Sequence, residues 1–415
     1  MTRVSVTFVG AAILVATTAL IFAQRQPDPR PRMVPGQSIE TRPPEKSDDK
    51  PAFPGQTRAP YKPGVAVDVT VITDKLHKPW SLAFLPGGRM LVSEKPGTMR
   101  IVDADGVLSE PLGGVPEVLA TGQIGLLDLA LDPAFGTNHR LFFMFSEPVE
   151  NGQSFHIAVG RATLDQQARA LRDVKVIFRA RPDVPRRQSA NSPGRIAIAR
   201  DGTLFVAIGD SSTSPPWDRA QRLDTHLAKI IHITADGAPA PGNPFASKQG
   251  ALPEIWSMGH RTPEGLAFDA RGQLWETEHG PRGGDELNKI EAGKNYGWPV
   301  IVHGIDYPGM KIGEGITEKA GMEQPIYYWD PVIAPSGLAF YDGSLFPSWH
   351  GDALVGSLRG EHVSRLTLKN DRVVSEEPLL VDQHSRIRDV RVGPDGAVYV
   401  LTDSDGKLLV VRPKK

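Results

Sequence analysis

The sequence predicts an all-β fold, and more specifically a six-bladed β-propeller. Two observations lead to this prediction. From about residue 67 onward, apolar and polar residues alternate as in half-buried strands, with hardly any helical periodicity. In addition, one hairpin phrase recurs six times: a small residue, an apolar strand, an Asp-Gly or Gly-Gly turn, and a second apolar strand.

The six copies are, in chain order, WSLAFLPGGRMLVSE from Trp80, GLLDLALDPAFGTNHRLFFMFSE from Gly125, GRIAIARDGTLFVAIGD from Gly194, EGLAFDARGQLWETEHG from Glu264, SGLAFYDGSLFPSWHGDALVGSL from Ser336 and RDVRVGPDGAVYVLTD from Arg388. Asp-Gly and Gly-Gly suit such hairpins because these residues accept the positive φ that tight turns require. Six similar units favour radial repetition, since a ring of sheets leaves few exposed edges. The alternative is a β-sandwich in which the hairpins are coincidental.

The composition is that of an ordinary globular protein. The 415 residues are 40% hydrophobic and 23% charged, and the formal net charge is −1. A nucleic-acid partner is not expected, because such partners are held by an excess of basic residues. The chain contains no cysteine, which excludes disulfides, thiolate metal sites and cysteine nucleophiles. Phosphate-binding loops, nucleophile elbows and zincin motifs are also absent from the sequence.

The N-terminal part differs from the rest. Residues 1–23 combine a short basic start with a long uncharged apolar run and predict an export signal with cleavage after Ala23. An uncleaved anchor is the alternative, because the run is about long enough to span a bilayer. Residues 24–66 hold ten of the 37 prolines and predict a disordered or polyproline-like tether. We therefore expect a propeller domain over 67–415 that is periplasmic or secreted and possibly anchored at its N-terminus.

Polar residues gather at the ends of the repeated strands. They are Gln123, Arg195, Asp210, Arg261, Arg359, Arg386 and Arg388. In a propeller, the loops at one end of the central channel converge on a shared pocket. Five arginines at such a place predict an anionic ligand, because guanidinium groups bind carboxylates in a bidentate fashion. The alternative for any one of them is a salt bridge at the surface or between blades.

The stretch EHGPRGGDELNKIEAGKNYGWP, from Glu278 to Pro299, is the richest in glycine, acidic and aromatic residues. Calcium prefers carboxylate and carbonyl oxygens, and Gly-Pro turns can present carbonyl groups. A calcium site is one interpretation of this stretch. A structured loop whose acids are satisfied within the protein is the other.

Several segments together resemble the soluble PQQ-dependent glucose/sorbosone (aldose sugar) dehydrogenase family. They are GQIGLLDLALDPAF, LDTHLAKIIHI, EIWSMGHRTPEGLAF, EHGPRGGDELN, GKNYGWP, IAPSGLAFY and SRIRDVRVGPDG, within residues 68–412. The resemblance implies a six-bladed propeller that uses the quinone cofactor PQQ and Ca²⁺. It also implies oxidation of the C1 hydroxyl of an aldose to a lactone, with electrons passing on to an acceptor that the resemblance does not name.

The resemblance also implies site residues. Those expected around PQQ are Gln123, Arg261, Arg386 and Arg388, with Arg359 at a position where the family has a basic residue. The carbonyls of Gly280 and Pro281 are expected to hold the calcium next to PQQ. A second calcium site is expected at Asp285, Glu286 and Tyr296, and Asp210 is expected to orient the catalytic base.

This chain departs from the family at the base itself. The family's base histidine lies four residues before an arginine, and the matching position before Arg195 is Asn191. An asparagine amide cannot accept a proton at ordinary pH, so Asn191 cannot act as a general base. One hypothesis is a dehydrogenase with another base, for which Glu264, His260 and Asp210 are the candidates. The others are a non-catalytic propeller that binds a carbohydrate or quinone, and a calcium-dependent lactonase-like propeller.

Overall fold

The computed structural model describes residues 33–414 except 168, 213–214 and 216. The expected signal at residues 1–23 and the first part of the expected tether, residues 24–32, lie outside the described residues. No helix among the described residues is both long and apolar enough to cross a membrane. Helical structure in this part of the chain is limited to α1 (Phe135–Asn138) and short 3₁₀ turns.

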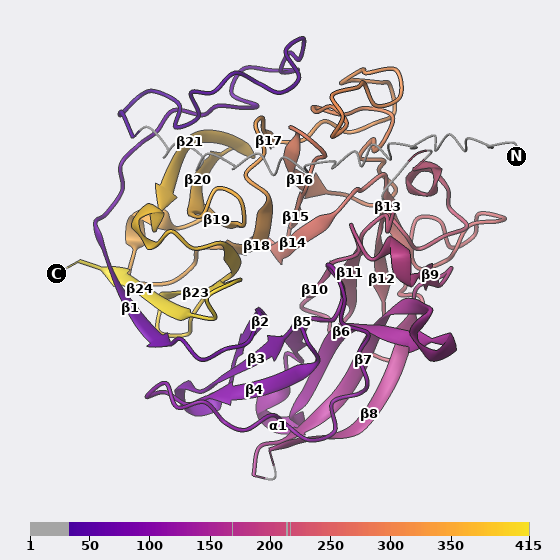
Figure 1. The fold of residues 1–415 in the computed structure, drawn as a ribbon, viewed down its shortest axis with the longest axis vertical. Helices are drawn as coiled ribbons and strands as arrows, with labels where there is room; N and C mark the ends of the chain where they lie inside the picture. The colour runs from indigo at the N-terminus through magenta and orange to yellow at the C-terminus, as the bar shows by residue number, and fades with distance from the viewer. Residues whose placement is uncertain (1–32, 168, 213–214, 216, 415) are drawn as a thin grey trace, which may run out of the picture. The chain divides into compact units, whose positions relative to one another are not determined.

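The strands form six antiparallel sheets arranged as the blades of a propeller, which confirms the predicted fold class (Figure 1). Blade 1 consists of β2 (Pro79–Phe84), β3 (Met90–Glu94) and β4 (Thr98–Val102). Blade 2 consists of β5 (Leu126–Leu131), β6 (Arg140–Val149), β7 (Ser154–Asp165) and β8 (Ala170–Arg179), with the short β9 (Val184–Pro185) beside β7. Blade 3 consists of β10 (Gly194–Ile198), β11 (Leu204–Ile208), β12 (Lys229–Ile233) and β13 (Ile255–Met258).

The other three blades complete the ring. Blade 4 consists of β14 (Pro263–Phe268), β15 (Leu274–Glu278), β16 (Asp285–Ile290) and β17 (Tyr327–Trp329). Blade 5 consists of β18 (Pro335–Phe340), β19 (Ala353–Ser357), β20 (Val363–Lys369) and β21 (Arg372–Leu379). Blade 6 consists of β22 (Ile387–Val392), β23 (Val398–Thr402), β24 (Leu408–Pro413) and β1 (Val67–Thr73). The first strands β2, β5, β10, β14, β18 and β22 contact one another in sequence around the centre.

The six copies of the hairpin phrase coincide with the first two strands of the six blades. At their turns, Gly87, Gly202, Gly272 and Gly396 all have φ near +80°. A side chain at such a φ is strained, which explains why the phrase carries glycine at these turns.

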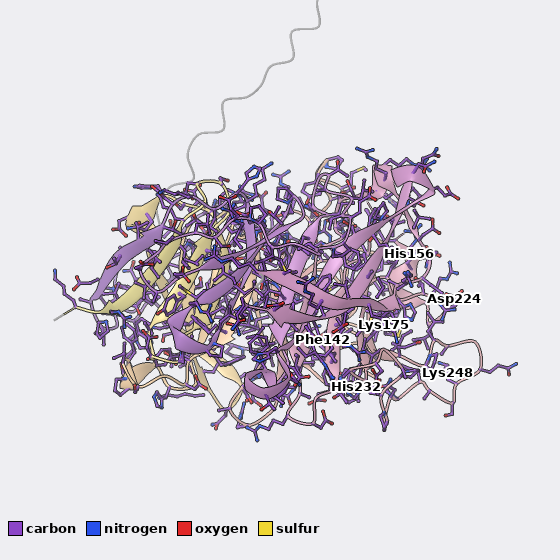
Figure 2. The ribbon with its side chains drawn as sticks, turned by 90° about the horizontal axis from the view of Figure 1, so that it is seen from below. Phe142, His156, Lys175, Asp224, His232 and Lys248 are labelled. Carbon is purple, nitrogen blue, oxygen red and sulfur yellow. The ribbon has the colours of Figure 1, made fainter. Side chains whose placement is uncertain are left out.

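Viewed from the side, the propeller carries exposed charges such as Lys175 on its surface, while Phe142 of β6 belongs to the buried core (Figure 2).

A buried ion-pair network joins the first strands at the centre of the ring. Arg195 of β10 pairs with Asp389 of β22 at 3.0 Å and with Asp128 of β5 at 3.4 Å. Its guanidinium also lies 4.1 Å from the centre of the Trp80 ring. Arg391 pairs with the same two aspartates. Arg195 therefore forms a salt bridge between blades, which was the alternative to ligand binding for each of the five arginines. It does not present its charge to a ligand.

The ring is closed by the two ends of the domain. Strand β1 pairs antiparallel with β24, from Val67 opposite Pro413 to Thr73 opposite Leu408. The strand that comes first in the chain therefore completes the last blade. This pairing gives β24 a partner on both edges and makes β1 the outer strand of blade 6.

Residues 33–66, called the strap below and drawn in indigo in Figure 1, pack against blades 4 and 5. The main-chain N–H groups of Glu45 and Lys46 donate to Asp330 at 2.8 and 3.1 Å. The N–H of Ala59 donates to the hydroxyl of Tyr327 at 2.9 Å, and the side chain of Gln56 is fully buried. For residues 33–66 this corrects the predicted disordered tether. The reason is that prolines leave a segment without regular structure but still allow it to bind a surface through individual side chains.

We expect Gln56→Ala to loosen the strap. The amide of Gln56 donates to Pro325 O at 3.0 Å and accepts from the N–H of Ala52 at 2.6 Å, so its loss leaves buried groups unpaired at a cost of about 1–3 kcal/mol. Limited trypsin digestion followed by mass spectrometry should show faster cleavage after Arg58 in the variant. Equal cleavage rates in the variant and the parent protein would mean that the strap is not held by this contact.

Candidate active site

The functional candidates lie at one end of the propeller because of strand geometry. In an antiparallel hairpin, the residues just before the first strand and just after the second strand lie at the same end. Asn191 and Arg261 precede first strands, and Asp210 and His279 follow second strands. Residues that lie at strand ends in the sequence, on different blades, therefore share one rim of the propeller.

This rim contains a cavity on blade 4. It is lined by Arg261, Glu278, His279, Gly280, Pro281, Gly284, Glu286, Tyr296, Trp298, Ile301 and Val302. Three of the segments predicted from sequence therefore meet here: the one around Arg261, the Gly-Pro turn and the GKNYGWP stretch.

Arg261 is the central cation of the cavity. Its Nη1 donates to the carbonyls of Gly280 at 2.8 Å and His279 at 3.0 Å, and its guanidinium lies 5.1 Å from the centre of the Trp298 ring. The Nε atom of Arg261 is buried and has no hydrogen-bond partner. A buried donor without an acceptor is costly, so this N–H is ready to bind an anionic ligand.

Arg386 directly precedes β22 and Arg388 lies within it, and the two side chains reach the same aspartate, as their R-x-R spacing predicted. Both pair with Asp403, at 3.4 and 2.8 Å, and Arg388 also pairs with Glu264 at 3.2 Å. Arg386 is the more exposed of the two. Glu264 therefore offsets the charge of Arg388. The carboxyl of Glu264 is buried, and this burial raises its pKa.

His279 shows that the arginines converge. Burial, together with the positive charges of Arg261, Arg388 and Arg386, lowers the pKa of His279 to about 3. Its Nε2 lies 2.8 Å from Pro335 O, which requires a proton on that nitrogen. His279 is therefore a neutral imidazole in the middle of three cations.

The loop before β10 holds Asn191 beside Asp210. The N–H of Asn191 donates to Gln123 Oε1 at 2.5 Å, and its side-chain amide donates to Ser212 O at 2.8 Å. The side chain of Asp210 lies near that of Asn191, and its Oδ2 accepts from Trp298 Nε1 at 2.9 Å. The structure thus brings Gln123, Asn191 and Asp210 together at the rim.

Of the three candidates for a replacement base, only Asp210 contacts Asn191. Glu264 is paired with Arg388, and His260 is fully buried behind the cavity wall against Tyr296. Burial raises the pKa of Asp210 to about 6, although Arg261 opposes the shift.

This shift predicts a pH effect on stability. The folded pKa of Asp210 lies above its ordinary value of 3.8, so the stabilisation by the protonated form is complete below about pH 4 and is lost as the pH rises through about 6. The loss amounts to about 3 kcal/mol at most, and we expect Asp210→Asn to flatten this part of the stability curve. Thermal unfolding from pH 4 to 7 measures it. Parallel curves for the variant and the parent protein would rule out ionisation of Asp210 as the cause.

The predicted calcium ligands fall into two groups. Gly280 and Pro281 are buried at the cavity wall, and the carbonyl of Gly280 accepts from Arg261. Asp285 and Glu286 are adjacent in β16, so their side chains point to opposite faces of the sheet. The carboxylate of Asp285 accepts from the N–H groups of Gly280, Ile333 and Ala334 at 2.7–2.8 Å. Burial raises the pKa of this carboxyl to about 7.

Asp285 therefore organises two loops, and its side chain does not join that of Glu286. Glu286 faces Asn288, whose amide donates to it at 3.0 Å. The hydroxyl of Tyr296 donates to Lys289 O at 2.7 Å and accepts from Glu291 N–H at 2.9 Å. The side chains of the predicted triad thus point to three different places.

Arg359 is the second residue after β19, and its N–H donates to Ile333 O at 2.9 Å. Sequence reasoning missed Lys95, His279, Trp298 and Asp403. Lys95 and Asp403 directly follow the second strands of blades 1 and 6. Their position at a strand end is the same sequence signal that identifies Asp210 on blade 3. The ammonium of Lys95 donates to Gly122 O at 2.7 Å, and its burial and the nearby Arg388 lower its pKa.

A family model described as Glucose / Sorbosone dehydrogenase matches residues 76–410. The chain belongs to this family. The glucose/sorbosone dehydrogenase family includes the aldose sugar dehydrogenase YliI of Escherichia coli, which is 42% identical over 353 residues and covers 84% of this chain and 93% of that protein. Quinoprotein glucose dehydrogenase B of Acinetobacter calcoaceticus is 26% identical, covering 82% of this chain and 86% of that protein.

Solved structures agree with this assignment to the glucose/sorbosone dehydrogenase family. The apo form of the soluble aldose sugar dehydrogenase of E. coli superposes with a TM-score of 0.79 at 41% identity, covering 84% of this chain and all of that chain. The PQQ-bound form of aldose sugar dehydrogenase from Streptomyces coelicolor gives a TM-score of 0.68 at 29% identity, covering 85% of this chain and 99% of that chain. The resemblance stated from the sequence is thereby confirmed at the level of the family.

Proposed function

We propose that this chain is a PQQ- and Ca²⁺-dependent oxidoreductase that converts the C1 hydroxyl of aldoses to lactones, with turnover limited by the asparagine at position 191. The observation that supports the proposal is the convergence of Arg261, Arg386 and Arg388 around His279, beside the Gly280–Pro281 carbonyls. The PQQ-bound relative makes PQQ, a tricarboxylate, the anion that we propose for this cluster.

The residues of the cavity fit such an anion. The buried Nε of Arg261 has no acceptor within the protein, and a carboxylate would provide one. Arg386 and Arg388 would bind further carboxylate oxygens, and Gln123 and Arg359 complete the proposed set. The carbonyls of Gly280 and Pro281 would hold Ca²⁺. PQQ would supply the acceptor for the hydride from C1, with Ca²⁺ polarising it.

The protein itself supplies binding, orientation and charge. Arg261 lies between Trp298 and the Gly-Pro turn, so its guanidinium is held in place before any ligand arrives. Asp210 is placed to orient a group at position 191, because it contacts that residue and is itself fixed by Trp298 and the N–H of Ser212. What the loop does not provide at position 191 is a proton acceptor.

Asn191 also supports a second candidate function, namely a propeller that binds a carbohydrate or quinone without turnover. Its amide is engaged with Ser212 and Asp210, so it stabilises the loop without taking a proton. The two candidates share the same cavity and differ only in chemistry.

Reconstitution distinguishes them. The purified protein is loaded with PQQ and Ca²⁺, the absorption spectrum of the quinone is followed, and aldoses are then added with an artificial electron acceptor. Reduction of the bound quinone by an aldose supports the dehydrogenase. Binding without reduction supports the non-catalytic candidate, and the absence of PQQ binding would contradict the proposed cofactor.

A further inference from the structure

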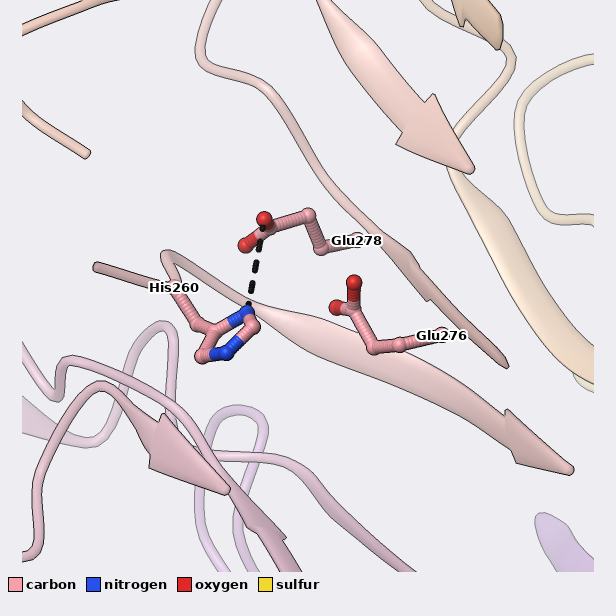
Figure 3. Close-up of side chains that lie close together, drawn as sticks. All are labelled: His260, Glu276 and Glu278. Atoms are coloured by element: carbon pink, nitrogen blue, oxygen red, sulfur yellow. Dashed lines mark ion pairs between the residues drawn. The ribbon is translucent and has the colours of Figure 1, made fainter. Parts of the chain in front are cut away.

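Beside the cavity, blade 4 buries a cluster of acidic side chains, of which Glu278 and Glu286 also line the cavity. Glu276 and Glu278 alternate along β15 and therefore share one face of the sheet. The paired strand β16 places Asn288 opposite Glu276 and Glu286 opposite Glu278. His260, from the loop before β14, points its imidazole into this group (Figure 3). The side chains of Glu276, Glu278, Asn288 and His260 are all less than 5% exposed.

Three polar atoms of this cluster have no hydrogen-bond partner although they are buried. They are His260 Nδ1, Glu276 Oε1 and Asn288 Oδ1. His260 Nδ1 lies 3.8 Å from Glu278 Oε1, which is too far for a hydrogen bond. A proton on Nδ1 would have no acceptor, and a lone pair there would face carboxylates. Neither tautomer of the imidazole therefore satisfies this atom within the protein.

The negative charges are also poorly compensated. The amide nitrogen of Asn288 lies 3.0–3.2 Å from carboxylate oxygens of Glu276, Glu278 and Glu286, which share its two hydrogens, and the N–H of Arg261 donates to Glu278. In the part of the chain that the structure describes, none of these three carboxylates forms an ion pair with a lysine or an arginine. A buried carboxylate requires a partner of opposite charge, because removing it from water is costly.

We propose that His260, Glu276 and Glu278 form a buried site for a divalent transition-metal cation of the Zn²⁺ class. One ligand atom from each of the three residues lies within 4.8 Å of the others. A cation among them would give the orphaned Nδ1 of His260 a partner and would compensate the two carboxylates. The site uses none of the residues to which the family resemblance assigns calcium.

The imidazole decides the class of metal. Ca²⁺ prefers a shell made only of oxygens, whereas imidazole nitrogen together with carboxylate suits Zn²⁺ and its neighbours. The second nitrogen of His260, Nε2, lies 2.9 Å from the hydroxyl of Ser257. Such a contact on the far nitrogen is typical of a metal-bound histidine, because it fixes the ring and the tautomer.

The site would have a structural role next to the cavity. Its ligands come from the loop before β14 and from β15, so one cation would tie these two segments together. His260 immediately precedes Arg261, and Glu278 immediately precedes His279. Metal binding would therefore fix the two segments that form the cationic wall.

Metal binding can be tested on the whole protein without PQQ or sugar, which separates this inference from the proposed function. Chelator-treated protein is incubated with Zn²⁺ or Ca²⁺, desalted, and analysed for bound metal and for Tm. We expect one equivalent of Zn²⁺ and a rise in Tm of about 5 °C or more. Co²⁺ in place of Zn²⁺ should give visible absorption bands characteristic of mixed nitrogen and oxygen ligation.

Matched variants locate the site. Glu276→Gln and His260→Gln should each lose the bound equivalent, and Glu276→Gln should do so without lowering the Tm of the metal-free protein, because it removes a buried charge. The controls are Glu376→Gln, a buried glutamate bound by Tyr327 and Trp329, and His303→Gln, a buried histidine stacked on Tyr328. Both should retain Zn²⁺. Failure to bind Zn²⁺ or Co²⁺, or binding of Ca²⁺ alone that His260→Gln leaves intact, would overturn the proposal.

Discussion

Replacing Asn191 with histidine is expected to raise the rate of aldose oxidation by about 10²–10⁴-fold, the usual contribution of a positioned general base. The expected gain is in kcat, because the imidazole acts on the bound sugar and not on its binding. The measurement is steady-state oxidation of an aldose by the PQQ- and Ca²⁺-loaded protein with an artificial acceptor, compared between the variant and the parent protein.

The loop is suited to accept this histidine. Asn191 has φ near +53°, a left-handed conformation in which asparagine, aspartate and histidine are the most frequent non-glycine residues. Asp210 already contacts the side chain at this position, so it is available to orient an imidazole. The substitution should therefore leave the fold and Tm nearly unchanged.

Two controls isolate the role of the base. Asn191→Gln keeps an amide at the position and should leave the rate where it is. Adding Asp210→Asn to the Asn191→His variant should remove much of the gain, since the orienting acid is lost. If Asn191→His binds PQQ normally but gains no rate, position 191 does not hold the missing base.

Replacing Arg195 with methionine is expected to destabilise the propeller by about 3–5 kcal/mol, since it leaves buried carboxylates with one cation fewer. Arg195 is 1% exposed and bonds to Asp128 and Asp389 from two other blades. It also donates to the main-chain carbonyls of Glu264 at 2.5 Å and Arg388 at 3.2 Å. The measurement is the midpoint of urea unfolding.

Arg271→Met is the matched control. Arg271 likewise pairs with two aspartates, Asp269 and Asp371, but its side chain is 65% exposed. Exposed pairs contribute only about 0–1 kcal/mol, so its midpoint should move little. Similar shifts for the two variants would show that the central network does not hold the blades together.

Much of the fold could be predicted because its signals are local. Alternation defines each strand, and the glycine at each hairpin turn is required by a positive φ that any chain segment would need there. The strap could not be predicted in this way. It is ordered through contacts such as that of Gln56 with Pro325, which lies 269 residues away in the chain, and no periodicity within residues 33–66 reports such a contact.

The candidate site was predictable in position but not in its pairings. Strand ends located Arg261, Arg386 and Arg388, because hairpin geometry fixes where strand ends lie. Arg388 pairs with both Glu264 and Asp403. This pairing depends on how the blades are placed around the ring, which no local sequence pattern reports. The acidic cluster, in contrast, was accessible from sequence: in LWETE the two glutamates alternate and so share a face, whereas the adjacent Asp285 and Glu286 cannot.

The closure of blade 6 has a consequence for how this protein is made. Strand β1 leaves the ribosome early, but its partner β24 is the last strand of blade 6 to be made. During synthesis, β1 has to wait unpaired while the other five blades emerge, and the ring can close only once β24 has emerged. A chain that is cut short by a single strand at its C-terminal end therefore loses the partner of its first strand as well.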